Sequence, residues 1–272
     1  LQGKRKTPKE LGIFLLKRGA WLVLAEWTII ALGWTLNPYF NIFPLQVIWA
    51  IGISMVVMGI MLLIKTPYQL ILGIGIVIVA GHNLLDIPES APGFQAGFWW
   101  DLFHHGSFAP YEIAPNRFLL LLYAFPVWTG VMLLGYSAGK LFTEPYTPAT
   151  RKTMLVRIGL GVLAFFFLLR LSNAYGDPVD WAFQKNWLYT FMSFINVDKY
   201  PASLLYLCIT LGIGILLLAF IEPVRNRFTT TMSIFGRTAL FYYILHIYLI
   251  RILSAVYFFS NGHTLEEAAV LG

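Results

Sequence analysis

Long apolar stretches, separated by shorter polar segments, set the pattern of this chain. The stretches carry few charges, and most have the roughly 17 to 25 residues that a helix needs to cross a bilayer. The strict alternation of apolar and polar residues that marks membrane β-strands is absent from the sequence. The pattern predicts an all-α integral membrane protein, a polytopic helical bundle with about seven transmembrane helices. The predicted spans cover residues 19–36, 42–64, 70–85, 118–137, 154–169, 202–220 and 239–259.

Two of the predicted connections are much longer than the others. They cover residues 86–116 and 171–200, and both are rich in Trp, Tyr, Phe, Pro, Asp and Gly. Loops of this length are usually functional or disordered, and such an aromatic composition argues against disorder. We therefore expect short interfacial helices in both loops, on the outer side of a single transmembrane domain that covers residues 1–272. An aromatic belt at the headgroup level is the alternative interpretation of the tryptophans.

Composition and charge support a membrane protein and set its orientation. Hydrophobic residues make up 58% of the chain and charged residues 12%, with a mean hydropathy of +0.70. The net charge of +6 could indicate nucleic-acid binding, but most of the basic residues fall on one side of the predicted spans. That side is the cytoplasm by the positive-inside rule. We therefore predict no nucleic-acid partner, and a multi-pass protein of the bacterial inner (cytoplasmic) membrane with residue 1 in the cytoplasm.

Two ionisable residues, Glu26 and His246, interrupt apolar runs. Each lies eight or nine residues beyond a basic residue at the predicted inner boundary, which corresponds to a depth of about 12 to 14 Å. A charged group at this depth needs a partner or a wet cavity. If their helices are neighbours, Glu26 could orient His246 as a general base, so both are candidate catalytic residues. The alternative is that Glu26 binds a backbone or hydroxyl group and His246 contacts a neighbouring helix.

A dense set of polar residues is predicted at the outer ends of the spans. Aromatic rings and planar hydrogen-bonding groups are suited to a sugar, whose ring faces stack while its hydroxyls need partners. The competing interpretation is a set of caps and loop-pinning contacts, since Asp177-Pro178 is a natural turn and Ser203 opens a helix. The candidate substrate-binding residues are Arg170, Asn173, Tyr175, Asp177, Lys199, Tyr200, Ser203, His82 and Asp86.

The third predicted span ends with two residues of types that can bind a metal. His82 and Asp86 are four residues apart and share a helix face, and His104 and His105 follow in the next loop. A zinc site needs further ligands, and no characteristic zinc spacing is present. We therefore predict no metal. Cys208 is the only cysteine, which excludes an intrachain disulfide.

Several segments resemble a known family. They are LLKRGAWLVLAEWTIIALGW at 15–34, FPVWTGVMLLGYSAGKLF at 125–142, LLRLSNAYGDPVDW at 168–181, FINVDKYPASLLYLCITLG at 194–212 and GRTALFYYILHIYLI at 236–250. In this order they are similar to bacterial membrane proteins related to heparan-alpha-glucosaminide N-acetyltransferase. The resemblance implies transfer of an acyl group, in particular acetyl, from cytoplasmic acyl-coenzyme A to an amine or hydroxyl of a sugar or amino sugar on the outer face.

The resemblance also implies what this chain lacks. Members of that family begin with further helices, which bear an arginine-glycine motif and the principal catalytic histidine, and commonly end with another helix. We therefore expect further helices before Leu1 and after Gly272, and a supporting role for His246. The positions that match the family are Glu26, Gly135, Arg170, Asn173, Tyr175, Gly176, Asp177, Lys199, Tyr200, Ser203 and His246.

A mechanism follows as a hypothesis. Arg157, Arg225, Arg227 and Arg237 would hold the phosphates of acyl-coenzyme A, the only co-substrate expected, at the inner face. A transporter or channel for a small polar solute, and a non-catalytic membrane scaffold, are the alternatives. Gly135 and Gly139 have the small-xxx-small spacing of closely packed helices, which is compatible with a homodimer in the bilayer.

Overall fold

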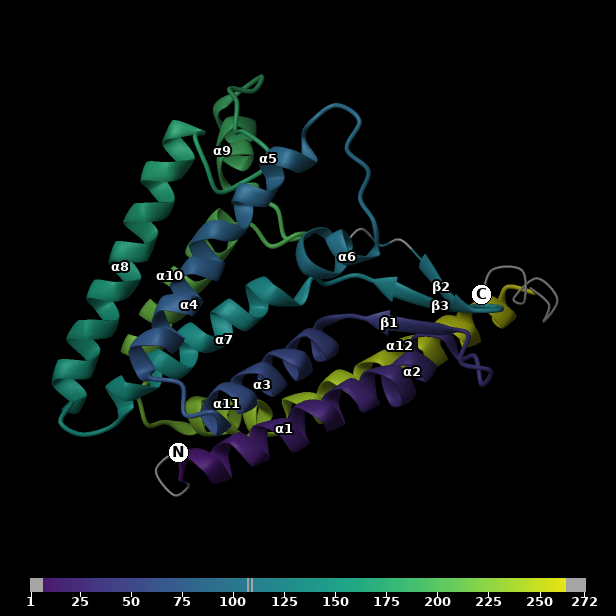
Figure 1. Cartoon of the computed structure of the whole chain (residues 1–272), viewed down its shortest axis with the longest axis horizontal. Helices are drawn as coiled ribbons and strands as arrows, with labels where there is room; N and C mark the ends of the chain where they lie inside the picture. Colours follow the sequence, from purple (N-terminus) through teal and green to yellow (C-terminus); the bar gives the residue numbers. More distant parts are fainter. Residues whose placement is uncertain (1–6, 107, 109, 263–272) are drawn as a thin grey trace.

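The first helical segment is longer than a single regular helix. The computed structural model describes residues 7–106, 108 and 110–262. Helix α1 (Pro8–Ala25) begins with a capping box between Thr7 and Glu10 and continues through a π-helical turn (Glu26–Ile30) into α2 (Ala31–Thr35). It ends where Leu36 adopts a left-handed backbone conformation. Figure 1 shows this segment running along the lower edge of the molecule.

Helix α3 (Val47–Leu63) packs antiparallel on α1 through two pairs of glycines. Gly12 faces Gly59 and Gly19 faces Gly52, so that each pair is one heptad from the other. A Cβ atom added at Gly19 would lie 2.5 Å from the Gly52 carbonyl oxygen. Small residues at such positions let two backbones approach closely, which is how helices pack without a hydrophobic driving force in lipid.

A small mixed sheet corrects the all-α prediction. Strand β1 (Ile42–Leu45) pairs in parallel with β3 (Arg117–Leu121), and β2 (Pro110–Ala114) pairs antiparallel with β3. The strands β1 and β3 open two of the predicted spans, whose helices therefore start later, α3 at Val47 and α7 (Phe125–Ala138) at Phe125. A short apolar run is compatible with a buried strand as well as a helix, and periodicity alone does not distinguish them.

Four of the helices among the described residues are long and apolar enough to span a bilayer. The chain is therefore a multi-pass membrane protein, mostly helical as predicted. The four spans are Tyr68–Glu89, which joins α4 (Tyr68–Gly81), a 3₁₀ turn (His82–Leu85) and α5 (Asp86–Glu89), then α8 (Pro148–Ser172), α10 (Leu204–Ile221) and α12 (Ala239–Ser260). The shorter α3 and α7 and the charged α1 fall outside this group, and the total of about seven spans stays a prediction.

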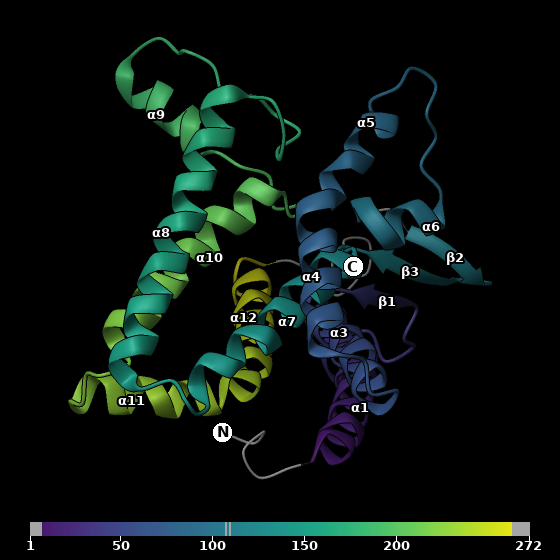
Figure 2. The same ribbon diagram turned by 60° about the vertical axis from the view of Figure 1, so that its left-hand side comes forward.

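The helices pair in a simple way. Helix α8 packs on α10, α4 packs on α7, and α12 lies beside α2. The α8–α10 pair and the α1–α3 pair occupy opposite sides of the molecule, with α7 and α12 between them (Figure 2). One end of the bundle carries α11 (Arg227–Arg237) and the starts of α1 and α8, and we call it the basic end. The other end carries α5 and α9 (Trp187–Ile195), and we call it the loop end.

The long predicted connections hold short elements at the loop end. Residues 86–116 contain α5, α6 (Phe98–Trp100), a π-helical turn (Asp101–His105) and β2, while residues 171–200 contain α9. That these elements lie at the membrane interface stays a prediction.

The glycine pair with small-xxx-small spacing, Gly135 and Gly139, lies on an open face. Apart from its chain neighbours and the backbone of its own helix, no described atom comes within 4 Å of a Cβ atom added at Gly135 or at Gly139. Both positions on and after α7 can thus receive lipid or another helix, and the homodimer stays a prediction.

Candidate functional site

Arg170 is the buried hub of the second long loop. Its side chain is 2% exposed at the end of α8. The guanidinium donates hydrogen bonds of 2.6 to 3.0 Å to the carbonyl oxygens of Val179, Ser193, Phe194 and Asn196. One of its nitrogens also lies 3.6 Å from a carboxylate oxygen of Asp177. These contacts occupy all three guanidinium nitrogens, so Arg170 holds the loop in place and presents no donor to a substrate in this conformation.

Asp177 and Ser203 join that loop to the start of α10. The Asp177 carboxylate accepts hydrogen bonds from the backbone N–H of Asp198, at 2.9 Å, and from the Ser203 hydroxyl, at 2.7 Å. The Ser203 oxygen in turn accepts from the Tyr206 N–H at 3.0 Å and caps α10. The contacts of these two residues therefore match the capping interpretation rather than substrate binding.

Asn173 and Tyr175 are engaged in a similar way. Asn173 ends α8 in a left-handed conformation and forms two hydrogen bonds with the backbone of Trp181. The Tyr175 hydroxyl donates a 2.5 Å hydrogen bond to the carbonyl oxygen of Ala80, which ties the loop to α4. Both side chains thus hold the second long loop in place, Asn173 through Trp181 within the loop and Tyr175 through Ala80 on α4.

Lys199 and Tyr200, in contrast, keep exposed surface. The Tyr200 hydroxyl is 3.0 Å from the Tyr123 hydroxyl, and its ring makes an edge contact with Phe108 at 5.4 Å between centroids. Lys199, Tyr200 and Tyr123 border a small cavity of about 10 Å³, which has room for about one water molecule and is also lined by His105. Tyr200 itself is 40% exposed. The group can stack a ring and bind a hydroxyl, as sugar recognition requires.

The pKa values of the Tyr123 and Tyr200 phenols are shifted in opposite directions. Burial raises the pKa of Tyr123 to about 12, and the hydrogen bond with Tyr200 acts in the same direction. That same hydrogen bond is the main cause that lowers the pKa of Tyr200, and the nearby Lys199 lowers it further. Tyr200 is therefore the more acidic of the two phenols, and it lies on the exposed side.

His82 and Asp86 were expected to act together, but they face different partners. The ring nitrogens of His82 lie 2.9 Å from the carbonyl oxygen of Val79 and 2.8 Å from that of Ala202. His82 therefore joins α4 to the segment before α10. Asp86 instead faces the π-helical turn, where Oδ1 lies 2.9 Å from Nε2 of His104.

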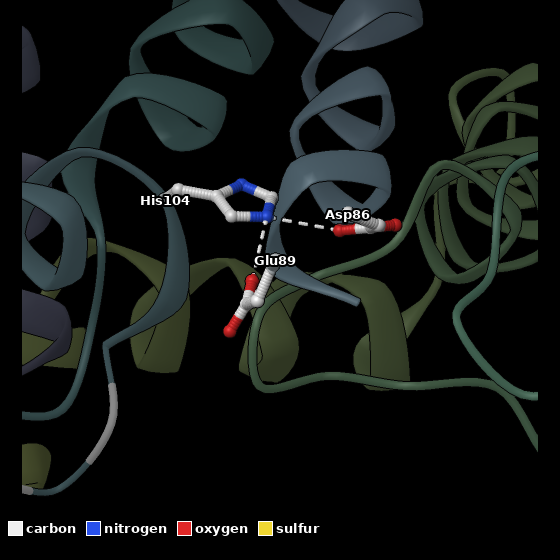
Figure 3. Close-up of side chains that lie close together, drawn as sticks. All are labelled: Asp86, Glu89 and His104. Carbon is white, nitrogen blue, oxygen red and sulfur yellow. Dashed lines mark ion pairs between the residues drawn. The ribbon is translucent and has the colours of Figure 1, made fainter. Parts of the chain in front are cut away.

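Figure 3 shows Asp86 and Glu89 converging on His104. Glu89 was missed in the sequence, since nothing in the spacing linked it to a residue fifteen positions later in the π-helical turn. His104 is almost fully buried, whereas both carboxylates are partly exposed. Asp86, Glu89 and His104 thus form a second polar cluster at the loop end, separate from the contacts of Arg170.

The expected pairing of Glu26 with His246 is not formed. Glu26 is fully buried, and its Oε2 accepts a 3.0 Å hydrogen bond from the Trp49 N–H, in the first turn of α3. His246 is exposed on α12 and bonds within its own helix, to the carbonyl oxygen of Tyr242. Among the described residues, no hydrogen bond or ion pair joins the two. The geometry corresponds to the alternative in which Glu26 binds a backbone group.

Glu26 acts as a cap supplied by another helix. The α3 N-cap residue, Gln46, makes no side-chain capping bond, so the carboxylate of Glu26 satisfies an N–H that would otherwise lack a partner. We expect Glu26→Leu to lower the free energy of unfolding by about 0.5 to 2 kcal/mol. Glu26→Gln should fall closer to the parent protein, because an amide oxygen can still accept from Trp49. Thermal unfolding in detergent compares the variants, and equal losses in both would contradict the capping role.

The basic end holds a pocket that the sequence did not indicate. The cavity, of about 350 Å³, is lined by Phe14, Lys17, Arg18, Trp21, Leu22 and Leu240. It lies between the first helix and the start of α12, with an apolar wall and two cationic residues. Such a lining fits a molecule with an apolar chain and an anionic group.

The predicted phosphate-binding residues are all exposed, three of them at this end and Arg157 nine residues along α8. Arg157 lies on α8, Arg225 precedes α11, and Arg227 and Arg237 are the first and last residues of α11. Their placement leaves their side chains available to an anionic partner, and their contact with acyl-coenzyme A stays a prediction.

In comparisons with known proteins, no family model, curated protein or solved structure matches this chain.

Proposed function

We propose that this protein is a membrane-embedded acyltransferase, which moves an acyl group, in particular acetyl, from cytoplasmic acyl-coenzyme A to a sugar or amino sugar at the outer face. The observation that carries the proposal is the difference between the two ends of one membrane bundle. The basic end has an apolar cavity with Lys17 and Arg18, and the loop end has an aromatic and polar surface around Tyr200. The resemblance to the acyltransferase family described above points in the same direction.

The chemistry of the donor fits the basic end. Acyl-coenzyme A combines phosphates, which attract lysine and arginine, with a long neutral arm that prefers an apolar wall. Lys17 and Arg18 can bind a phosphate at the mouth of the cavity, while Trp21 and Leu240 line its apolar part. Arg237 lies three residues before Leu240 and can add a further cation.

The chemistry of the acceptor fits the loop end. A sugar ring can stack on the exposed face of Tyr200, and its hydroxyls can bind Lys199 and the phenol. In the reaction, an acceptor nitrogen or oxygen attacks the thioester carbonyl carbon. The new C–N or C–O bond forms as the C–S bond breaks, and the proton lost by the acceptor ends on the coenzyme A thiol.

Release of the coenzyme A thiol tests this proposal. Purified protein in detergent, given acetyl-coenzyme A and an amino sugar such as glucosamine, should release thiol only when both substrates are present. Proteoliposomes that move a labelled amino sugar without consuming acetyl-coenzyme A would instead identify a transporter. No thiol release and no transport would favour the scaffold alternative.

Substitutions at the cavity test the donor site. We expect the double variant Lys17→Ala, Arg18→Ala to raise the KM for acetyl-coenzyme A roughly 10-fold or more, because hydrogen bonds to charged groups contribute about 1.5 to 3 kcal/mol each. The matched control is Lys65→Ala, an exposed lysine between α3 and α4 that does not line the cavity. Equal KM values in the double variant and the control would remove this cavity from the mechanism.

The role of His246 is tested by His246→Ala. Its exposed position and its bond to Tyr242 predict a turnover close to that of the parent protein, with any catalytic base elsewhere. A loss of 10² or more in kcat, the size of a general-base contribution, would restore His246 to the catalytic centre.

A further inference from the structure

We propose that Asp86, Glu89 and His104 form a binding site for one divalent transition-metal ion, with Zn²⁺ as the best fit. The inference does not depend on the proposed acyl transfer, because it concerns binding at the loop end alone. It departs from the expectation of no metal, which rested on the need for further ligands and on the absence of a characteristic zinc spacing.

The backbone brings the three ligands together. Asp86 and Glu89 are three residues apart in α5, so their side chains leave the helix on the same face. His104 belongs to the π-helical turn Asp101–His105, a type of insertion that is frequent at functional sites because it turns a side chain out of helical register. The ligand atoms of the three residues lie within 4.8 Å of one another.

The distances match a coordination sphere. Nε2 of His104 lies 2.9 Å from Oδ1 of Asp86 and 3.3 Å from Oε2 of Glu89. Ligands at the roughly 2.0 to 2.2 Å of Zn–N and Zn–O bonds are about 3.3 to 3.5 Å apart in a tetrahedral site. Both distances from His104 are within about 0.6 Å of that spacing, and the two carboxylate oxygens lie no more than 4.8 Å from each other, so one ion can reach all three atoms after small side-chain movements.

The orientation of His104 favours an ion over a simple ion pair. Its side chain is 1% exposed, and its Nε2 has no partner of hydrogen-bonding geometry among the described residues, although two carboxylates are near. A protonated imidazole would direct its N–H at one of these oxygens. Instead, Nε2 is near one oxygen of each carboxylate (Figure 3), an arrangement in which a single metal ion can be shared by the three groups.

A second layer of contacts orients each carboxylate. The other oxygen of Asp86 accepts a 2.7 Å hydrogen bond from the buried amide of Asn83, whose own oxygen is held by the Leu204 N–H. The other oxygen of Glu89 lies 2.5 Å from Nδ1 of His105. One oxygen of Asp86 is thus held by a neighbour while the second faces His104, which is how outer-shell partners position a metal ligand. Glu89 places one oxygen near each of the two histidines.

The charge of the two carboxylates and their partial exposure also suit a cation. Two acidic side chains and an imidazole supply oxygen and nitrogen ligands, and a divalent cation would balance the negative charge of the carboxylates. The side chains of Asp86 and Glu89 are 22% and 24% exposed, so an ion can enter from the loop end. The described residues supply three ligands, and the remaining tetrahedral position is open to water or to an oxygen atom of a bound molecule.

Metal analysis of the purified protein tests the site. The protein is produced without a histidine tag, stripped with a chelator, and titrated with Zn²⁺ by calorimetry and with Co²⁺ by visible absorption. We expect one ion per chain and the intense d–d bands of a four-coordinate Co²⁺ site. Failure of the folded parent protein to bind Zn²⁺, Co²⁺ or Mn²⁺ at micromolar concentrations would overturn the proposal.

Isosteric variants locate the ion. Asp86→Asn, Glu89→Gln and His104→Gln should each weaken binding by more than the 10- to 100-fold that outer-shell changes cost, and His105→Gln should stay within that range. Asp180→Asn, an exposed carboxylate in the other long loop, is the matched control and should bind like the parent protein. Gel filtration and thermal unfolding confirm that each variant is folded. One ion bound with equal affinity by all variants would place the site elsewhere and contradict the assignment.

Discussion

Replacing Arg170 with methionine is expected to destabilise the protein by about 3 to 5 kcal/mol, the usual result of breaking a buried ion pair from one side. Methionine fills much of the same volume, so the loss comes from polar groups rather than from a void. The substitution leaves four carbonyl oxygens without their donor and the Asp177 carboxylate, which is 2% exposed, without its cation. We expect the loop of residues 171–200 to loosen first, since Arg170 is its main anchor.

The matched control is Arg157→Met on the same helix. Arg157 is exposed, so its replacement should stay within about 0.5 kcal/mol of the parent protein. Unfolding in a detergent titration, followed by tryptophan fluorescence, measures both. Adding Asp177→Asn to Arg170→Met should recover part of the loss, because the uncompensated charge is then removed. Equal stability of the two arginine variants would contradict the role of Arg170 as a structural hub.

The second large effect is expected for Gly19→Leu, which should lower the free energy of unfolding by about 1 to 3 kcal/mol or more. The added Cβ atom would meet the Gly52 carbonyl oxygen at 2.5 Å, and the closest obstacle is backbone that cannot rotate away. Helices α1 and α3 would have to separate along the whole glycine seam. Because Glu26 caps α3 from the same segment, that separation would also weaken this contact.

Gly73→Leu on α4 separates this packing effect from the general effect of removing a helical glycine. No described atom outside its own helical turn lies within 4 Å of a Cβ atom added there. Its conformational contribution is favourable, since glycine costs up to about 1 kcal/mol in a helix. Gly73→Leu should therefore be neutral or stabilising, in contrast to Gly19→Leu. Thermal unfolding in detergent compares the two, and similar losses would show that α1 and α3 do not pack through their glycines.

The membrane class and four of the spans could be predicted because they depend on long apolar runs. Strands β1 and β3 could not, since four or five apolar residues before a helix look like the first turn of that helix. The glycine seam was not recognised either. It needs α1 and α3 to be matched antiparallel, whereas the visible small-xxx-small motif, at Gly135 and Gly139, lies on an open face.

At the loop end, the sequence indicated where polar residues gather but not how they pair. Arg170 and Asp177 stand out as charges beside an apolar span, although their partners are mainly backbone groups that no motif specifies. Glu89 and His104 meet where a π-helical turn changes the direction of the chain within the first long loop, residues 86–116, and no sequence motif marks that turn. The shared depth of Glu26 and His246 did not establish contact, since helices at one depth can direct their side chains away from each other.

Transfer of a labelled acetyl group across a sealed membrane tests the proposed function most directly. Proteoliposomes with glucosamine enclosed receive labelled acetyl-coenzyme A outside, and liposomes without protein serve as the control. The account predicts labelled N-acetylglucosamine inside the vesicles and an equal amount of free coenzyme A outside, with the Lys17→Ala, Arg18→Ala variant slower at low acetyl-coenzyme A. Sealed vesicles that contain folded protein in both orientations but form no labelled sugar would contradict it.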